Sequence, residues 1–224
     1  RSALLTGRYI TRLGTQANTI AANAPWGVSL DETLLSQNLK DAGYATAQWG
    51  KWHLGMFSPC YIPQARGFDE ALGFLQGTED AYSHYNLYPS WYGYDWFRNG
   101  TVEDAAGQWE LPLLRAAATS FITRHRNKPW LGYMAFREVH GPLQVDAEYL
   151  ERFRDSLCCG GADTCVKPVG TYGVNATLCG MITAMDATVG ALVAVLNATA
   201  QLERTIIIFA SDNGAPVASP EGYS

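Results

Sequence analysis

Apolar residues along this chain recur with helical spacing in three stretches. The first begins near Ser29 or Asp31, ends at Gly43, and carries its apolar stripe at Leu30, Leu34, Leu35, Leu39 and Ala42. Helical spacing returns over residues 113–125 and is clearest over 180–197. These stretches predict helices with one apolar face each.

Short β-prone runs lie between the helical stretches and predict strands. The candidates are residues 44–49, 130–136 and 205–209, and the last of them predicts a fully buried strand. The alternation of helix and strand periods predicts an α/β fold. Residues 60–107 predict a long irregular excursion over the sheet, and residues 154–177 an exposed loop.

Polar side chains follow each of the three predicted strands. Lys51 and His53 come after the first strand, His140 after the second, and Asp212 with Asn213 after the third. In open α/β sheets, ligands bind beyond the carboxyl ends of the strands. We therefore expect these side chains to converge on one cleft.

The residue types at these positions are suited to binding an anion, transferring a proton or binding a metal ion. Each residue also has a purely structural interpretation. Lys51 and His53 point to the same side of an extended segment, where they could bind an anion and transfer a proton, although exposed Lys and His are common. Taken alone, His140 is better explained as a structural histidine. Asp212 and Asn213 offer oxygen ligands to a hard cation, but Asp-Asn-Gly is also typical of a turn. Two side chains cannot fill the roughly six to eight positions that calcium requires.

Composition narrows the class of protein. With 47% hydrophobic and 17% charged residues, the 224-residue chain is globular. Its net charge of -5 and the lack of a Lys/Arg cluster argue against binding to nucleic acid. The sequence contains no apolar run of about 18 residues, so we expect no membrane span.

Cysteines and sequons point to the secretory pathway. The chain has five cysteines, none in a CxxC pair, and three Asn-x-Thr sequons at Asn99, Asn175 and Asn197. This pattern favours a secreted or lysosomal glycoprotein with disulfides. The alternative is that the sequons arose by chance and the thiols are reduced.

Four segments, in order along the chain, resemble the type I sulfatases. They are residues 1–8 (RSALLTGR), 50–55 (GKWHLG), 139–145 (VHGPLQV) and 211–214 (SDNG). Within the family, residues 66–69 and 82–84 resemble the arylsulfatase B group. The resemblance implies that residues 1–224 are part of a sulfatase catalytic domain truncated at both ends, with an alkaline-phosphatase-like mixed sheet flanked by helices on both faces.

The resemblance also implies roles for individual residues. Sulfatases hydrolyse sulfate esters with a formylglycine made from the cysteine of Cys-x-Pro-Ser-Arg, and Arg1 matches the arginine of that motif. Lys51 matches the lysine that binds sulfate, and His53 and His140 match the histidines that move protons. Asp212 and Asn213 match two calcium ligands. The implied substrate is a sulfate ester, plausibly on a sugar, and the implied partner of the full-length protein is the formylglycine-generating enzyme.

The chain departs from the family pattern at several positions that the family needs for catalysis. The formylglycine cysteine would lie four residues before Arg1, and none of the five cysteines present stands in the motif. The N-terminal Asp pair and a later lysine of the family are also outside the chain, so we expect these 224 residues to be inactive by themselves. The alternatives are a phosphatase or phosphonate hydrolase of the same fold, a non-catalytic binder of sulfated glycans, or a non-functional gene fragment.

Overall fold

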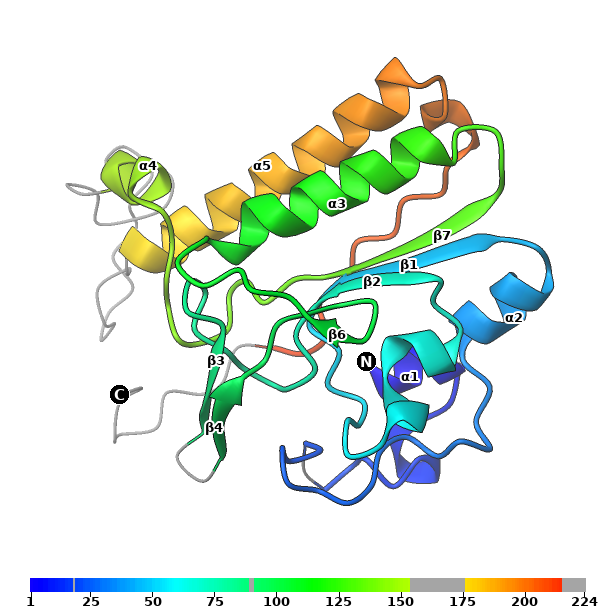
Figure 1. The fold of residues 1–224 in the computed structure, drawn as a ribbon. Helices are drawn as coiled ribbons and strands as arrows, with labels where there is room; N and C mark the ends of the chain where they lie inside the picture. The colour runs from blue at the N-terminus through cyan, green and yellow to red at the C-terminus, as the bar shows by residue number, and fades with distance from the viewer. Residues whose placement is uncertain (18, 89–90, 154–175, 215–224) are drawn as a thin grey trace.

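A mixed sheet of five strands forms the centre of the computed structural model, which describes residues 1–17, 19–88, 91–153 and 176–214. The strand order is β6-β5-β2-β1-β7 (Figure 1). The strands are β1 (Ala45–Gly50), β2 (Glu70–Gly73), β5 (Phe97–Arg98), β6 (Thr101–Val102) and β7 (Trp130–Ala135). A separate antiparallel hairpin consists of β3 (Tyr85–Tyr88) and β4 (Trp91–Tyr94). The expected α/β class is confirmed.

The central strand β1 runs parallel to both β2 and β7. All of its residues are buried, and Ala45, Ala47 and Trp49 belong to the core on one side of the sheet. On the other side, the Thr46 hydroxyl donates to the carbonyl oxygen of Gly67 at 2.7 Å. Parallel pairing brings the carboxyl ends of β1, β2 and β7 to the same edge of the sheet.

Two glycines allow these strand ends to approach closely. Gly50 has a φ of 91°, and a Cβ at this position would lie 2.3 Å from the carbonyl oxygen of Ala135. Gly73 has a φ of 144°, and its Cβ would lie 2.2 Å from the carbonyl oxygen of Gly50. Only glycine fits both the backbone angle and the contact. The three strand ends are therefore held against one another.

Two long helices cover one face of the sheet, α3 (Glu110–Arg124) and α5 (Ala176–Ala198), lying side by side in Figure 1. Trp49 packs edge-on against Phe121 of α3, with ring centroids 5.4 Å apart. The short α4 (Ala147–Leu150) and η4 (Glu151–Phe153) pack against α5, and η6 (Leu202–Arg204) follows it. The helices predicted over 113–125 and 180–197 are confirmed, and both begin a few residues earlier than predicted.

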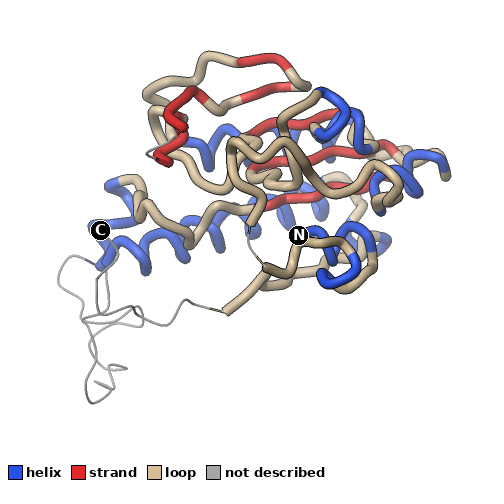
Figure 2. The backbone as a smooth tube through the Cα atoms, turned by 90° about the horizontal axis from the view of Figure 1, so that it is seen from below, coloured by secondary structure: helices blue, strands red, loops and turns tan. Residues whose placement is uncertain are grey.

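Short helices and loops cover the opposite face, as Figure 2 shows from below. Leu34, Trp52 and Phe68 are buried there in a second core. Helices therefore flank the sheet on both faces, as expected. The helical elements of this layer are α1 (Ser2–Thr6), η1 (Ile10–Arg12), α2 (Leu35–Asp41), η2 (Pro59–Tyr61) and η3 (Pro63–Arg66).

The predicted start of the first helix, at Ser29 or Asp31, was wrong, because α2 begins only at Leu35. The buried guanidinium of Arg66 donates to the carbonyl oxygens of Val28, Ser29 and Glu32 at 2.9, 3.2 and 2.7 Å. Those carbonyls are bound by a side chain from outside the helix. The segment therefore wraps around Arg66 as a turn, and the helix follows it.

The prediction of an irregular excursion over residues 60–107 was also wrong in part. β2, β5 and β6 lie in this stretch and join the main sheet. β2 has four residues and β5 and β6 two each, which is too short to show a period in the sequence. Their position comes from pairing with distant residues, such as Leu72 beside Trp49.

Residues 205–209 do not form the fully buried strand that their composition predicts. They form no strand, and Ile206 and Ile208 are 88% and 81% exposed. In Figure 1 this segment runs from the end of α5 past β7. A buried strand needs neighbours for its backbone and a layer on each face. The described residues provide neither for this segment.

Other predictions concern single positions. By length and composition alone, α5 could cross a membrane, and in the structure it packs along α3. Cys179 on α5 is disulfide-bonded, whereas Cys60 is a free, exposed thiol. Asn99 and Asn197 are exposed, and Asn175 and most of the predicted loop at 154–177 lie outside the described residues.

Candidate active site

Lys51 lies directly after the central strand, at the edge where the three parallel strands end. The backbone N–H groups of Lys51 and Trp52 donate to the carbonyl oxygens of Ala135 and Phe74, both at 2.9 Å. The segment after β1 thus continues to pair alternately with β7 and β2. This pairing holds the Lys51 side chain in a buried position, with only 6% of the residue exposed.

His53 continues the same segment in a left-handed conformation, with a φ of 57°. Its Nε2 lies 3.1 Å from the carbonyl oxygen of Ile20. A carbonyl can only accept, so Nε2 carries the proton in the neutral ring and Nδ1 has the free lone pair. No hydrogen bond within the described part of the chain engages Nδ1. The backbone of Gly77 packs against the ring, since a Cβ there would lie 2.6 Å from Cε1.

His140 lies in the loop after β7 and is exposed. Its Nδ1 is 2.7 Å from the carbonyl oxygen of Gly141 and therefore donates to it, which leaves Nε2 with the lone pair of the neutral ring. The Thr78 hydroxyl donates to the same carbonyl at 2.8 Å. The loop that carries His140 is thus connected to the segment after β2.

Arg1 and Asp212 come from opposite ends of the chain and lie together. Arg1 Nη2 is 3.9 Å from Asp212 Oδ2, and Arg1 Nη1 donates to the Tyr133 hydroxyl on β7 at 3.4 Å. The side chain of Arg1 is 13% exposed and that of Asp212 is 54% exposed. Asn213 directs its amide to the carbonyl oxygen of Gly214.

Burial and positive charge act together on the side chains of this group. Burial is the main cause that lowers the pKa of Lys51 to about 8, with Arg1 and Arg137 adding to it and Asp212 opposing it. Burial also lowers the pKa of His53 to about 3, and Lys51, Arg1 and His140 lower it further. The structure therefore brings Arg1, Lys51, His53, His140 and Asp212 within electrostatic reach of one another.

Sequence reasoning missed a buried ion pair beside this group. Arg137, just after β7, has a short hydrogen bond from its Nε to Glu110 Oε1 at the start of α3, and both side chains are fully buried. Glu79 and Glu138 are buried nearby, and burial raises the pKa of both. One signal was available in the sequence: Arg137 and Glu138 directly follow an apolar strand.

The described residues do not by themselves make a calcium site. Asp212 and Asn213 offer two oxygen donors of the right chemistry, but calcium takes about six to eight. Across residues 1–17, 19–88, 91–153 and 176–214, no group of three or more His, Cys, Asp or Glu side chains could hold a metal ion. Glu79, Glu110 and Glu138 surround a guanidinium instead.

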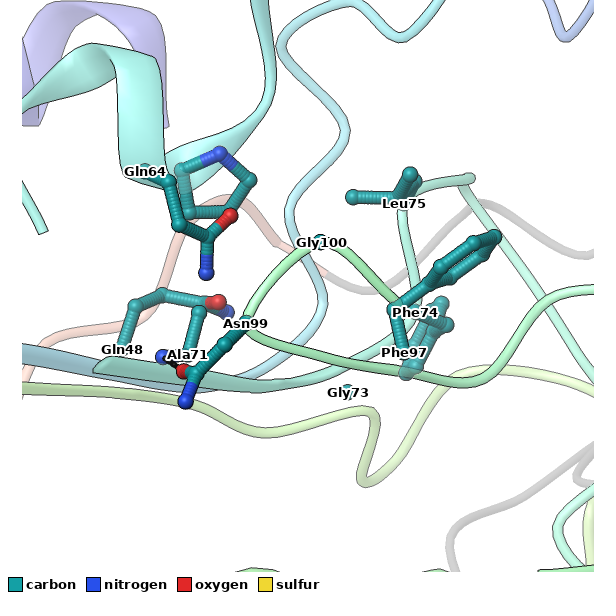
Figure 3. Close-up of a pocket in the computed structure, with 10 residues that line it drawn as sticks. Gln48, Gln64, Ala71, Gly73, Phe74, Leu75, Phe97, Asn99 and Gly100 are labelled. Carbon is teal, nitrogen blue, oxygen red and sulfur yellow. Dashed lines mark hydrogen bonds between the residues drawn. The ribbon is translucent and has the colours of Figure 1, made fainter. Parts of the chain in front are cut away.

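The enclosed pocket in Figure 3 lies apart from these charged residues. It is lined by residues of β1, η3, β2 with the segment after it, and the β5–β6 turn, including Gln48, Gln64, Phe74 and Asn99. Asn99 also accepts a hydrogen bond from the backbone of Ala71 at 2.8 Å. None of the side chains predicted to bind an anion or a metal lines this pocket.

Comparisons with known proteins point to one family. The Sulfatase family model matches residues 1–223. The chain is 31% identical over 219 residues to arylsulfatase J of Mus musculus, an alignment covering 96% of this chain and 34% of the relative. It is 30% identical over 235 residues to N-acetylgalactosamine-6-sulfatase of Mus musculus, covering 98% and 41%.

A solved structure supports the same assignment. The crystal structure of Ps i-CgsB in complex with k-i-k-neocarrahexaose superposes with a TM-score of 0.72 at 29% identity, covering 89% of this chain and 44% of that one. The chain thus spans less than half the length of these similar proteins.

Proposed function

Because the chain belongs to the sulfatase family, we propose that its cluster of basic side chains is the anion-binding part of a sulfate-ester hydrolase site. One observation carries this proposal: Arg1, Lys51, His53 and His140 lie within electrostatic reach of one another although they are far apart in the sequence, and Asp212 lies beside Arg1. A sulfate ester carries its negative charge on oxygens that such donors bind well.

In this proposal Lys51 and Arg1 hold the sulfate. Both are largely buried, so their charges are poorly screened by water and act strongly on a bound anion. A bound sulfate in turn stabilises the protonated form of Lys51, whose pKa burial otherwise lowers. A bound sulfate and the positive charge of Lys51 therefore stabilise each other.

The two histidines are suited to proton transfer. His53 is neutral at any pH well above 3 and has its lone pair on Nδ1, so it can accept a proton there. His140 keeps Nε2 available and is exposed, so in its protonated form it can donate to the oxygen that leaves sulfur. The negative charge of a bound sulfate favours the protonated form of His53.

The nucleophile and the metal of sulfatases are not supplied by the described residues. A formylglycine provides the attacking oxygen in the family, and none of the five cysteines here stands in the required motif. Sulfatases generally use calcium, and we propose that Asp212 and Asn213 provide two of its ligands, with the remaining oxygens coming from outside the described residues.

We further propose a sulfated sugar as the substrate and the secretory pathway as the compartment. N-acetylgalactosamine-6-sulfatase, 30% identical, is named for an aminosugar sulfate, and Ps i-CgsB, 29% identical, was crystallised with neocarrahexaose. The disulfide at Cys179 and the exposed sequons at Asn99 and Asn197 support the compartment. The narrower likeness to the arylsulfatase B group stays a prediction.

Binding of inorganic sulfate to the 224-residue chain tests the proposed site. Titration followed by NMR should give saturable binding, and Lys51→Ala and His140→Ala should each weaken it about tenfold, because a charge-assisted hydrogen bond is lost. Lys128→Ala removes an exposed lysine at the far end of β7 and should leave binding unchanged. The chain should show no turnover of an aryl sulfate.

Two results would contradict the proposal. Equal sulfate affinity in wild type, Lys51→Ala and His140→Ala would mean that the anion binds elsewhere. Hydrolysis of an aryl sulfate by the chain, abolished by Lys51→Ala, would mean that a nucleophile within these residues had been overlooked.

A further inference from the structure

We propose that Arg137 is a positioning residue for the site, with its buried guanidinium acting as the template around which the loop carrying His140 is folded. This inference rests on the proposed function, because it concerns how one of the proposed active-site residues is held. Arg137 itself is 1% exposed, and we assign it no contact with the substrate.

The loop wraps around its own arginine. Arg137 Nη1 donates to the carbonyl oxygen of Pro142 at 2.7 Å and to that of His140 at 3.4 Å. The backbone N–H of His140 donates back to the carbonyl oxygen of Arg137 at 2.7 Å. The backbone on both sides of His140 is thus bonded to a single residue.

The guanidinium is fixed in turn by a helix. Its Nε donates to Glu110, which is fully buried in the first turn of α3. Its Nη2 lies 3.8 Å from Glu138 Oε1. A planar guanidinium has several donors in a rigid fork, so it can bind a carboxylate on one side and carbonyls on another. Arg137 therefore transmits the position of α3 to the loop.

A second set of contacts closes the other side of the loop. Gln144 Nε2 donates to Asp80 Oδ2 at 2.5 Å, and Gln144 Oε1 accepts from the backbone N–H of Ala81 at 2.8 Å. With the Thr78 hydroxyl on the carbonyl of Gly141, these contacts join the loop to the segment after β2. Arg137 binds the carbonyls of His140 and Pro142, on either side of the Gly141 carbonyl that Thr78 binds.

The geometry makes a lysine at position 137 a poor replacement. An ammonium group could keep the charge beside Glu110, but it cannot also reach two carbonyls of the loop in the plane that the guanidinium uses. The ion pair with Glu110 needs the positive charge of Arg137. The contacts with the loop need the planar shape of its guanidinium. These two needs can be separated by experiment.

The test uses the whole 224-residue chain, with histidine labelled for NMR, since only four histidines are present. The Cε1–H resonance of His140 reports its position, and the affinity for inorganic sulfate reports the site. The main variant is Arg137→Met with Glu110→Gln, which removes both members of the ion pair. Arg137→Lys is the second variant, because it keeps a charge beside Glu110.

A matched control is available on the same helix. Arg124 on α3 forms an exposed ion pair with Glu70 on β2 at 2.9 Å. Arg124→Met with Glu70→Gln therefore removes the same pair of chemical groups, one of them on α3, without touching the loop. Its His140 resonance and sulfate affinity should equal those of the wild type.

We expect both Arg137 variants to shift the His140 resonance and to weaken sulfate binding about tenfold, with His125 as the unmoved reference. Wild-type values in Arg137→Lys would overturn the inference, even if the double variant failed to fold. His140→Ala separates this inference from the proposed function. If it leaves sulfate affinity unchanged, His140 is not part of the anion site, and the resonance alone still decides whether Arg137 positions the loop.

Discussion

The protonation of His53 is decided by its neighbours. The ring is buried beside Lys51 and Arg1, two groups that are positive at neutral pH. The carbonyl of Ile20 acts in the opposite direction by accepting from Nε2, and burial outweighs it. The free protein therefore holds a neutral imidazole where an isolated one would be partly charged near pH 6.5.

An NMR titration can test this environment. We expect His53 to titrate near pH 3 and Lys51→Met to raise its pKa, because a nearby positive charge is removed. Saturation with sulfate should raise it as well. Lys128→Met, far from the ring, should change nothing. A wild-type pKa at the ordinary value near 6.5 would contradict the burial that the structure shows.

The lowered pKa of His53 also makes the free energy of unfolding depend on pH. Because the unfolded chain binds a proton on His53 near pH 6.5 and the folded chain only near pH 3, His53 should lower the free energy of unfolding as the pH falls between these values. His53→Gln should flatten the dependence over that window in urea unfolding experiments.

Individual site residues could be predicted from the sequence where a polar residue directly follows an apolar strand. Lys51 and His140 could be placed because each comes directly after an apolar run. Glu110 and Arg137 could not be paired, since 27 residues separate them and only the packing of α3 on the sheet brings them together. A buried ion pair leaves no periodic trace in a sequence.

Among the elements, the turn before α2 depends on a side chain from another part of the chain. Arg66 ends η3 and binds three backbone carbonyls of residues 28–32, while its own carbonyl accepts from the Ser36 hydroxyl at 2.5 Å. Local propensity alone would extend the helix through this region. The contacts with Arg66 bind the backbone carbonyls of this region, so the helix does not extend through it.

Arg66→Met should therefore destabilise the protein strongly. It leaves three carbonyls without their charged donor, at a cost of about 3 kcal/mol in urea unfolding. Arg98→Met provides the control, because Arg98 makes an exposed ion pair with Glu103 and its loss should cost at most about 1 kcal/mol. Similar losses for the two variants would show that the Arg66 contacts contribute little.

Element types were predictable where an element is long enough to show a period. The helices α3 and α5 and the strands β1 and β7 were identified to within a few residues. Strand β2 was missed because it has only four residues and is defined by pairing with β1. Residues 205–209 were predicted wrongly as a buried strand because they have the composition of a core strand, whereas their side chains are mostly exposed.

For the whole molecule, residues 206–209 form an exposed apolar segment between α5 and Asp212. Their exposed fractions are 88%, 52%, 81% and 70% for Ile206, Ile207, Ile208 and Phe209. Contiguous apolar surface of this kind favours association. The segment lies only a few residues before Asp212, so its contacts bear on the site as well.

We expect the 224-residue chain to self-associate as its concentration rises. Ile206→Lys with Ile208→Lys should keep it monomeric in sedimentation experiments without lowering its melting temperature, because both side chains are already exposed. This change moves the net charge from -5 to -3 (-5 + 2). Thr123→Lys with Asn127→Lys makes the same charge change at other exposed positions and should not prevent association. A monomeric wild type at every concentration would contradict this prediction.

The glycine contacts at the end of the sheet have a practical consequence for redesign. Gly50 and Gly73 lock three strand ends by backbone contact, so the scaffold beneath the site does not depend on the side chains that follow it. A library that randomises positions 51 and 140 while keeping both glycines and His53 should yield mostly folded members. Selection on such a library could then explore anions of different shape and charge on a backbone that stays the same.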